Sequence, residues 1–187
     1  MAYYTANELE EMGFAFVGAN VQISRDAKIY EPEKMSIGAN SRIDDLCVLS
    51  GKVAIGSFCH ITPMCLIAGG TPGVFIDDFV TLAYGVKVFS QSDDYSGRTM
   101  VNSLIPGKYK NEYFSEVIIE RQAVIGANAT VMPGVKISQG SAIGAMSLVL
   151  ESTQPWTINV GVPSRFIKKR HRDIERLERD FLNENTI

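Results

Sequence analysis

The stretch VIGANATVMPGVKISQGSAIGAMSLV, residues 124–149, places an aliphatic side chain at every sixth position. Counting in sixes from Ile119 gives an unbroken series of Ile119, Ile125, Val131, Ile137, Ile143 and Val149. A strand repeats every two residues and a helix every 3.6, so a period of six must describe a larger unit. The simplest unit of this kind is a short strand followed by a corner.

The same spacing recurs upstream with changes of phase. The earlier positions are Val17, Ile23 and Ile29, then Ile37, Ile43, Leu49, Ile55, Ile61 and Ile67, then Ile76, Leu82 and Val88. Four residues after most of these stands a small or branched side chain, and Cys47, Cys59 and Cys65 occupy three such positions. Because no CxxC pair or nearby histidine accompanies them, the cysteines are predicted to be small buried thiols.

The repeats predict a three-sided column. Gly follows the aliphatic residue in five hexads, and the tripeptide GAN recurs at 18–20, 38–40 and 126–128. Gly and Asn tolerate the backbone angles of sharp corners. If three strands and three corners close one turn, the eighteen hexads make six coils of a parallel β-helix about 29 Å tall. The expected fold class is therefore all-β.

At this point the sequence resembles the hexapeptide-repeat acyltransferase family, whose fold is a left-handed parallel β-helix. The resemblance covers about residues 17–170, and it is strongest over 117–151 and over NVGVPSRFIKKR, residues 159–170. These segments are similar to the C-terminal half of galactoside and maltose acetyltransferases. The resemblance implies a homotrimer with active sites between neighbouring columns, acetyl-CoA as the acyl donor and no metal.

The whole chain, residues 1–187, is expected to form a single domain. Residues 1–16 are predicted to form a helical cap, since Thr5 and Glu8 have capping-box spacing. The β-helix is expected over residues 17–154, with an inserted loop at 89–116. A C-terminal segment and helix are expected over residues 155–187, because apolar residues recur at helical spacing from 164 to 184. A loop as long as the inserted one is commonly functional.

Composition excludes several classes of function. The 18 basic and 21 acidic residues give a formal net charge of -3, so the chain lacks a general field for nucleic acid. The N-terminus carries acids where a signal peptide needs bases, and no apolar run is long enough for a membrane span. A soluble cytoplasmic protein is therefore expected. Its two histidines are too few for the three-histidine metal site of the carbonic anhydrases that share this fold.

The chain departs from the family at the catalytic position. In the related acetyltransferases a histidine at the start of the inserted loop removes the proton of the acceptor hydroxyl, and aligning the hexads places Asp93 there. An aspartate with a pKa of about 3.9 is a weak base at neutral pH. Ser92 and Tyr95, beside this position, are the candidate substrate-binding residues.

Three routes around the missing histidine remain open. Repulsion between Asp93 and Asp94 would raise the pKa of one of them and so strengthen it as a base. His60 is a second candidate base, although the coil count puts it at a different corner from Asp93, so the two would meet only across a subunit interface. Alternatively, an amine acceptor that binds uncharged already has a reactive lone pair, and Asp93 would then position it.

The donor side matches the family more closely. The resemblance implies that the pantetheine arm of acetyl-CoA lies along the corner backbone near Ala127 and Ala145, and that Arg165 and Lys168 meet its phosphates. The leading interpretation is an acetyl-CoA-dependent acetyltransferase acting on a hydroxyl or amine of a sugar or nucleotide-linked sugar, in surface polysaccharide synthesis. The alternative is a trimeric structural or assembly module that has lost catalysis.

Overall fold

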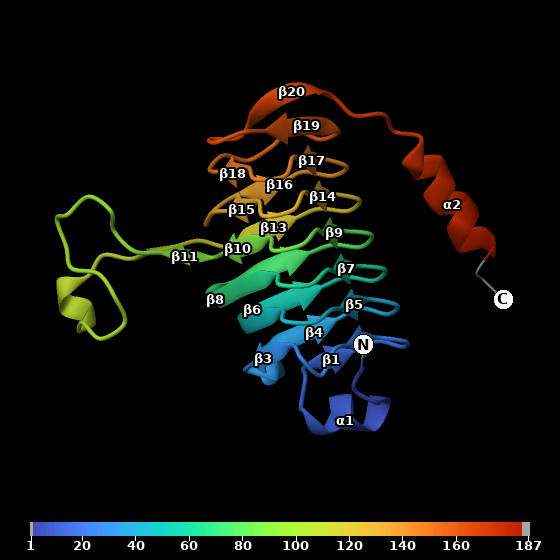
Figure 1. Cartoon of the computed structure of the whole chain (residues 1–187), viewed down its shortest axis with the longest axis horizontal. Coiled ribbons are helices and arrows are strands. Elements are labelled where there is room, and N and C mark those ends of the chain that lie inside the picture. Colours follow the sequence, from blue (N-terminus) through green and yellow to red (C-terminus); the bar gives the residue numbers. More distant parts are fainter. Residues whose placement is uncertain (1, 185–187) are drawn as a thin grey trace.

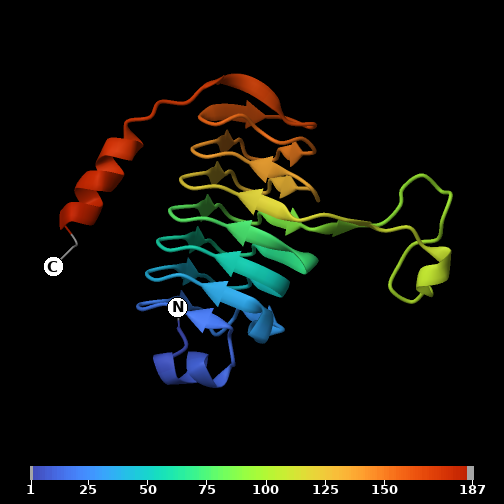
Figure 2. The same ribbon diagram turned by 180° about the vertical axis from the view of Figure 1, so that it is seen from behind.

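The computed structural model describes residues 2–184 as a left-handed parallel β-helix, with an arm on one side of the column and a helix on the other (Figure 1, Figure 2). Nearly every strand pairs in parallel with the strand one coil above and one coil below. On one face, Ile43 pairs with Ile61, Ile61 with Leu82, and Leu82 with Ile125. Each aliphatic residue of the hexad series therefore stacks on its counterpart, as predicted from the sequence.

The column has three faces, here named A, B and C in the order in which the chain crosses them from β2. Face A contains β2 Gln22–Ile23, β5 Arg42–Ile43, β7 His60–Ile61, β9 Thr81–Leu82, β14 Val124–Ile125, β17 Ala142–Ile143, β19 Thr157–Val160 and β20 Arg165–Lys169. Face B contains β3 Lys28–Tyr30, β10 Lys87–Phe89, β15 Thr130–Val131 and β18 Leu148–Val149. Face C contains β1 Phe16–Val17, β4 Met35–Ile37, β13 Val117–Ile119 and β16 Lys136–Ile137.

Two strands continue around the corner between faces B and C, where the hexad pattern predicts separate strands. These are β6, Val48–Ile55, and β8, Leu66–Ile76. Both bend at a glycine with positive φ, and these glycines, Gly51 and Gly70, are partners in the register between the two strands. The bend costs little at glycine because no Cβ opposes the left-handed conformation.

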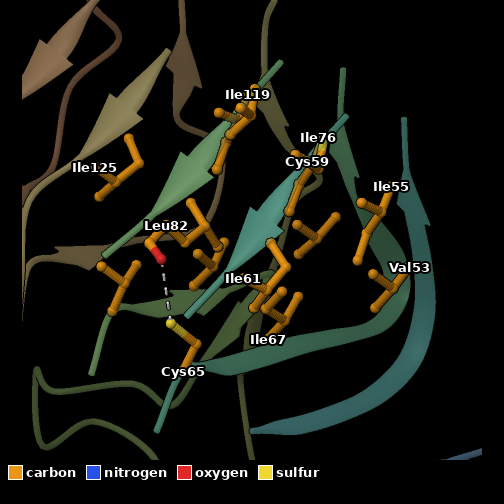
Figure 3. Close-up of a cluster of buried hydrophobic side chains, with 14 of the residues drawn as sticks. Val53, Ile55, Cys59, Ile61, Cys65, Ile67, Ile76, Leu82, Ile119 and Ile125 are labelled. Atoms are coloured by element: carbon orange, nitrogen blue, oxygen red, sulfur yellow. Dashed lines mark hydrogen bonds between the residues drawn. The ribbon is translucent and has the colours of Figure 1, made fainter. Parts of the chain in front are cut away.

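The interior is filled by the hexad residues. All eighteen are buried except Val17 and Ile29, which are half-buried in the first coil. Cys47, Cys59 and Cys65 are buried free thiols, as predicted, and Figure 3 shows Cys59 and Cys65 among the aliphatic side chains inside the column. The apolar interior is continuous from coil to coil, so the column stacks as one hydrophobic core.

At the corners, Gly and Asn have different roles, whereas the prediction gave both the same one. In the GAN tripeptides the asparagines Asn20, Asn40 and Asn128 adopt positive φ, whereas the glycines do not. Gly126 is instead required for close approach, since a Cβ there would lie 2.5 Å from the Ala145 nitrogen of the next coil. Larger residues also take the left-handed conformation at corners, among them Phe58 and Phe79.

Helix α1, Ala6–Glu11, covers the N-terminal end of the column (Figure 1). The predicted capping box is present, with Thr5 and Glu8 bonding each other's backbone N–H groups. Glu8 also forms an ion pair with Arg25 of the first coil at 2.6 Å, and Leu9 is buried. These contacts fix the helix over the open end of the hydrophobic core.

The C-terminal helix begins later than its periodicity predicts. Residues 165–169 form β20, which pairs antiparallel with β19, and only Ile174–Glu184 form α2. The apolar spacing that includes Ile167 therefore belongs to a strand, because pairing with β19 satisfies the backbone of this segment and covers the last coil. Beyond it, Arg170 donates from Nη1 to the Gln122 and Gly140 carbonyl oxygens, each at 2.9 Å, which fixes the chain to the corner between faces C and A just before α2 begins.

Candidate functional site

The inserted segment forms an arm that leaves the column between β10 and β13. Its base is a two-stranded antiparallel ribbon of β11, Gln91–Ser92, and β12, Tyr113–Phe114. Ser90 anchors the ribbon, because its hydroxyl donates to the Ala68 oxygen at 3.1 Å and its carbonyl oxygen accepts from the Ser115 N–H at 3.0 Å. The rest of the arm, which includes the 3₁₀ turn Gly107–Tyr109, stands away from the column (Figure 2).

The arm presents large apolar side chains to its surroundings. Tyr95 and Leu104 are each 88% exposed, and the other exposed apolar side chains are Met100, Val101, Tyr109, Tyr113 and Phe114. Isolated exposed apolar residues are common on monomers, but a cluster of this kind typically marks a binding or association surface.

The two aspartates of the arm have different surroundings. Asp94 accepts hydrogen bonds from the Ser96 N–H at 2.8 Å, from the Ser96 hydroxyl at 2.9 Å and from the Thr99 hydroxyl at 2.8 Å. Asp93 is exposed, and its carbonyl oxygen accepts from the Ser92 hydroxyl at 3.2 Å. Asp94 therefore shapes the turn, whereas the Asp93 carboxylate faces solvent.

The Asp94 pKa shifts in the direction opposite to that expected from repulsion within the pair. Hydrogen bonds from the Ser96 hydroxyl and N–H, followed by the Thr99 hydroxyl, lower the pKa of Asp94 because they stabilise its ionised form. The local turn thus overrides the effect of the adjacent charge at Asp94. A proton-accepting role for Asp94 is weakened accordingly.

His60 lies in strand β7 of face A, with its side chain on the outside, and not at the corner predicted from the coil count. Its Nε2 lies 2.9 Å from the Asp44 Oδ2 atom. Asp44 is only 2% exposed, and its other oxygen accepts from Arg42 Nε at 2.6 Å. The histidine ring is therefore held by a buried carboxylate that is itself paired with an arginine.

Within one chain the structure does not bring His60 and Asp93 together. Strand β7 and the arm lie on opposite sides of the column in Figure 1. A joint site of these residues would require a second chain, so the predicted meeting across an interface stays a prediction.

Ala127 and Ala145 lie one above the other at the corner between faces A and B. The Met146 N–H donates to the Ala127 oxygen at 2.8 Å, which ties the two coils together. Ala127 is half-buried and Ala145 is exposed. Small side chains therefore lie one above the other at this corner, and the binding of an extended ligand along them stays a prediction.

The predicted phosphate-binding residues line two different cavities near the last coil. A cavity of about 550 Å³ is lined by Arg165, Lys169, Ser164, Thr157 and Asn159, among others. Lys168 lines a separate cavity of about 270 Å³. Lys169 lines both cavities, so it is the lysine that accompanies Arg165 in the larger one.

Sequence reasoning missed Asp44, Arg42 and Lys169. Asp44 follows an aliphatic hexad residue at a position where five other hexads have glycine. That replacement is the one available signal, because the pairing of residues 44 and 60 depends on the register between adjacent coils.

Residues 2–184 contain no group of three or more His, Cys, Asp or Glu side chains arranged to hold a metal ion. In the same range no helix combines the length and apolar character needed to span a bilayer.

The column of stacked hexapeptide repeats with its long inserted arm places the protein among the hexapeptide-repeat β-helix proteins. No family model matches the chain. It is 39% identical over 184 residues to the dTDP-4-amino-4,6-dideoxy-D-glucose acyltransferase of Escherichia coli, spanning 97% of this chain and 95% of that protein. It is 26% identical to the putative lipopolysaccharide biosynthesis O-acetyl transferase WbbJ of E. coli K12, over 84% of this chain and 80% of that protein.

Among solved structures, the chain is similar to AntD, an N-acyltransferase from Bacillus cereus. The complex of AntD with dTDP and 3-hydroxybutyryl-CoA has a TM-score of 0.96 and 45% identity, covering 97% of both chains. A serine-to-alanine variant in complex with dTDP-4-amino-4,6-dideoxyglucose and coenzyme A has a TM-score of 0.97 and covers 98% of both. The chain therefore belongs to the hexapeptide-repeat family of sugar acyltransferases, and it is an acyltransferase.

Proposed function

We propose that the protein transfers an acyl group from a coenzyme A thioester to the amino group of a nucleotide-linked amino sugar, in the cytoplasm and during synthesis of a surface polysaccharide. The observation that carries this proposal is the end-to-end similarity to two aminosugar N-acyltransferases, which extends through the arm. The more distant O-acetyl transferase supports the same general chemistry on a sugar hydroxyl.

Asp93 favours an amine over a hydroxyl as the acceptor. A sugar hydroxyl is a poor nucleophile until a base removes its proton, whereas an amine attacks through its own lone pair once it is uncharged. An exposed carboxylate attracts the ammonium form and so concentrates and orients the acceptor. Asp93 takes this role, Asp94 holds the turn that presents it, and Ser92 and Tyr95 contact the sugar or the base.

The donor lies along the corner between faces A and B. Its pantetheine arm runs over the backbone at Ala127 and Ala145, where small side chains permit close approach. Its phosphates lie at the end of the column, where Arg165 and Lys169 supply positive charge and Lys168 adds a third cation nearby. The buried Ser164 hydroxyl oxygen, which has no hydrogen-bond partner among residues 2–184, supports a polar ligand in this cavity.

The active unit is a homotrimer. The exposed apolar side chains of the arm support association, because contact with a neighbouring column would remove them from water. The same contact would carry Asp93 of one chain toward face A of the next. The acceptor and donor sites are therefore completed by two chains.

Two measurements test this proposal. Acetyl-CoA is expected to raise the melting temperature saturably, and the protein is expected to release thiol from it with a dTDP-linked amino sugar. The matched control is the corresponding nucleotide sugar with a hydroxyl in place of the amine, which should release thiol far more slowly. Absence of both stabilisation and thiol release would favour the assembly-module alternative, and faster turnover of the hydroxyl sugar would reject the amine as the acceptor.

A further inference from the structure

We propose that Asp44 and His60 form a proton-transfer pair, in which Asp44 orients the His60 ring so that its Nδ1 atom takes a proton from the acceptor amine. This inference rests on the proposed function above. It adds a base that the arm does not supply, and it assigns Asp44 and Arg42 a positioning role in the reaction.

The geometry of the pair fixes both the orientation and the tautomer of the ring. The Asp44 Oδ2 atom lies 2.9 Å from His60 Nε2, so in the neutral ring Nε2 carries the hydrogen and donates it to the carboxylate. The lone pair is then on Nδ1, at the opposite side of the ring from the carboxylate. The His60 side chain is 40% exposed, whereas the Asp44 side chain is 3% exposed, so a ligand can reach the ring but not the carboxylate.

Asp44 is held in place from two coils. It follows Ile43 at the end of β5, and its N–H donates to the Ile61 oxygen of the next coil at 3.0 Å. Arg42, two residues before it, donates from Nε to its second oxygen. A buried carboxylate requires such partners, because desolvation of an unpaired charge is costly. Arg42 therefore compensates the charge of the buried carboxylate and fixes it in position to accept from His60.

Among residues 2–184, the charged side chains in contact with the His60 ring come from β5. From β5 it meets Asp44 and Arg42, and its register partner from β9 is Thr81, which carries no charge. Asp45 and Tyr84 lie at the adjoining corner, where Asp45 Oδ1 accepts from the Ser24 hydroxyl. The electrostatic environment of the ring is thus set chiefly by the Asp44–Arg42 pair.

The position of His60 on the column fits the proposed donor groove. His60 pairs with Thr81 in the next coil, and Thr81 pairs with Val124 in the coil after that. Ala127 follows Val124 at the corner of this same coil. His60 therefore lies two strand spacings, about 10 Å along the column, from the coil of Ala127. A pantetheine arm that runs down the edge past Ala145 and Ala127 would bring its thioester toward the exposed face of the ring.

Removal of a proton from the acceptor precedes acyl transfer in the proposed step. The acceptor enters as an ammonium, and neutral His60 takes one proton at Nδ1, leaving the amine lone pair free. The amine nitrogen then forms a bond to the thioester carbonyl carbon, the carbon–sulfur bond breaks, and the second proton passes from nitrogen to the leaving sulfur. The products are the amide, coenzyme A as its thiol, and a proton that protonated His60 returns to solvent.

The chain offers a direct spectroscopic test because it contains only two histidines, His60 and His171. In ¹⁵N-histidine-labelled protein, long-range ¹H–¹⁵N spectra above the imidazole titration should show His60 as the Nε2–H tautomer. Asp44→Asn should change the tautomer of His60, since its amide can donate to Nε2, and should leave His171 unchanged. If His60 in the unsubstituted protein proves to be the Nδ1–H tautomer, the proposal is overturned, whether or not the variant folds.

Kinetics supply the second test. His60→Gln is expected to lower kcat at least 100-fold, and Asp44→Asn at least 10-fold, with little change in the KM for acyl-CoA. Both should remove the acidic limb of the pH profile of kcat/KM, and the matched control His171→Gln should behave as the unsubstituted enzyme. Unchanged turnover in His60→Gln would overturn the pair and leave the proposed function standing. Failure of the unsubstituted protein to acylate any nucleotide-linked amino sugar would overturn both.

Discussion

Phe58 and Phe79 lie one above the other at the corner between faces C and A, with parallel rings whose centroids are 4.9 Å apart. Both residues have positive φ, a conformation that is uncommon for bulky side chains. Phe181 of α2 closes the stack, meeting both rings edge-on with centroid distances of 5.4 and 6.2 Å. The stacked rings of Phe58 and Phe79 are therefore the docking surface of the C-terminal helix.

Phe181→Ala should weaken this docking. Phe181 is 41% exposed, so the loss is expected to be about 1–2 kcal/mol, less than for a fully buried phenylalanine. Urea unfolding would measure the loss, and limited proteolysis should cleave before α2 sooner than in the parent. Arg176→Ala, which removes only the exposed ion pair with Asp180, is the control and should be near neutral. Equal effects of the two substitutions would contradict the assignment.

The hexad positions provide a second test, because their burial differs along the column. Ile61→Ala removes a fully buried side chain between two coils and should cost roughly 2–5 kcal/mol, whereas Ile29→Ala at the half-buried end should cost about 1 kcal/mol. Chemical unfolding at one fixed protein concentration gives both values, since association would make stability depend on concentration. A loss at Ile29 as large as that at Ile61 would mean that the first coil is covered in solution.

The column could be predicted from the sequence because every coil repeats one local rule. Each aliphatic residue has the same inward direction and the same neighbour one coil away, so Ile119 to Val149 fix the register without further information. The start of α2 could not be found in this way, because Ile167 fits a helical period equally well. Only pairing with β19, a tertiary contact, decides that residues 165–169 form a strand.

The candidate site was less predictable for the same reason. Asp93 could be proposed from the sequence because a family pattern marks its place, whereas Asp44 belongs to no local motif and meets His60 only through the coil register. Likewise, the direction of the Asp94 pKa shift depends on Ser96 and Thr99 folding back onto it. Contacts of this kind arise from the conformation of a single loop, which composition and spacing do not specify.

The different roles of Asp93 and Asp94 can be separated by substitution. Asp94→Asn should loosen the arm, since the carboxylate accepts three hydrogen bonds there, and hydrogen exchange over residues 93–112 should speed up. Asp93→Asn should leave exchange in the arm unchanged and raise the KM for the amine acceptor about 10-fold or more. The reverse pattern, with a looser arm in Asp93→Asn and a higher KM in Asp94→Asn only, would exchange the two assignments.

The buried thiols should be unreactive in the folded protein. Burial raises the pKa of Cys59 to about 11, so this thiol is protonated at pH 8 as well as inaccessible. An aromatic disulfide reagent should therefore titrate close to zero thiols in the native state and all three after unfolding in guanidinium. Rapid reaction of even one thiol in the native state would show that the column opens locally.

Helix α1 provides a prediction for the effect of acid. The hydrogen bond from Arg25, assisted by those from Thr5, lowers the Glu8 pKa from 4.5 to about 2. Because the folded-state pKa is the lower one, the stabilisation is fully present above about pH 4.5 and declines as the pH falls toward 2. The difference in melting temperature between the parent and Glu8→Gln should thus be constant near neutrality and shrink below pH 4.5. The control is Glu11→Gln, which removes a carboxylate of the same helix outside the capping box. If the melting-temperature difference for Glu11→Gln depends on pH to the same extent, the effect arises from net charge and not from the Glu8–Arg25 contact.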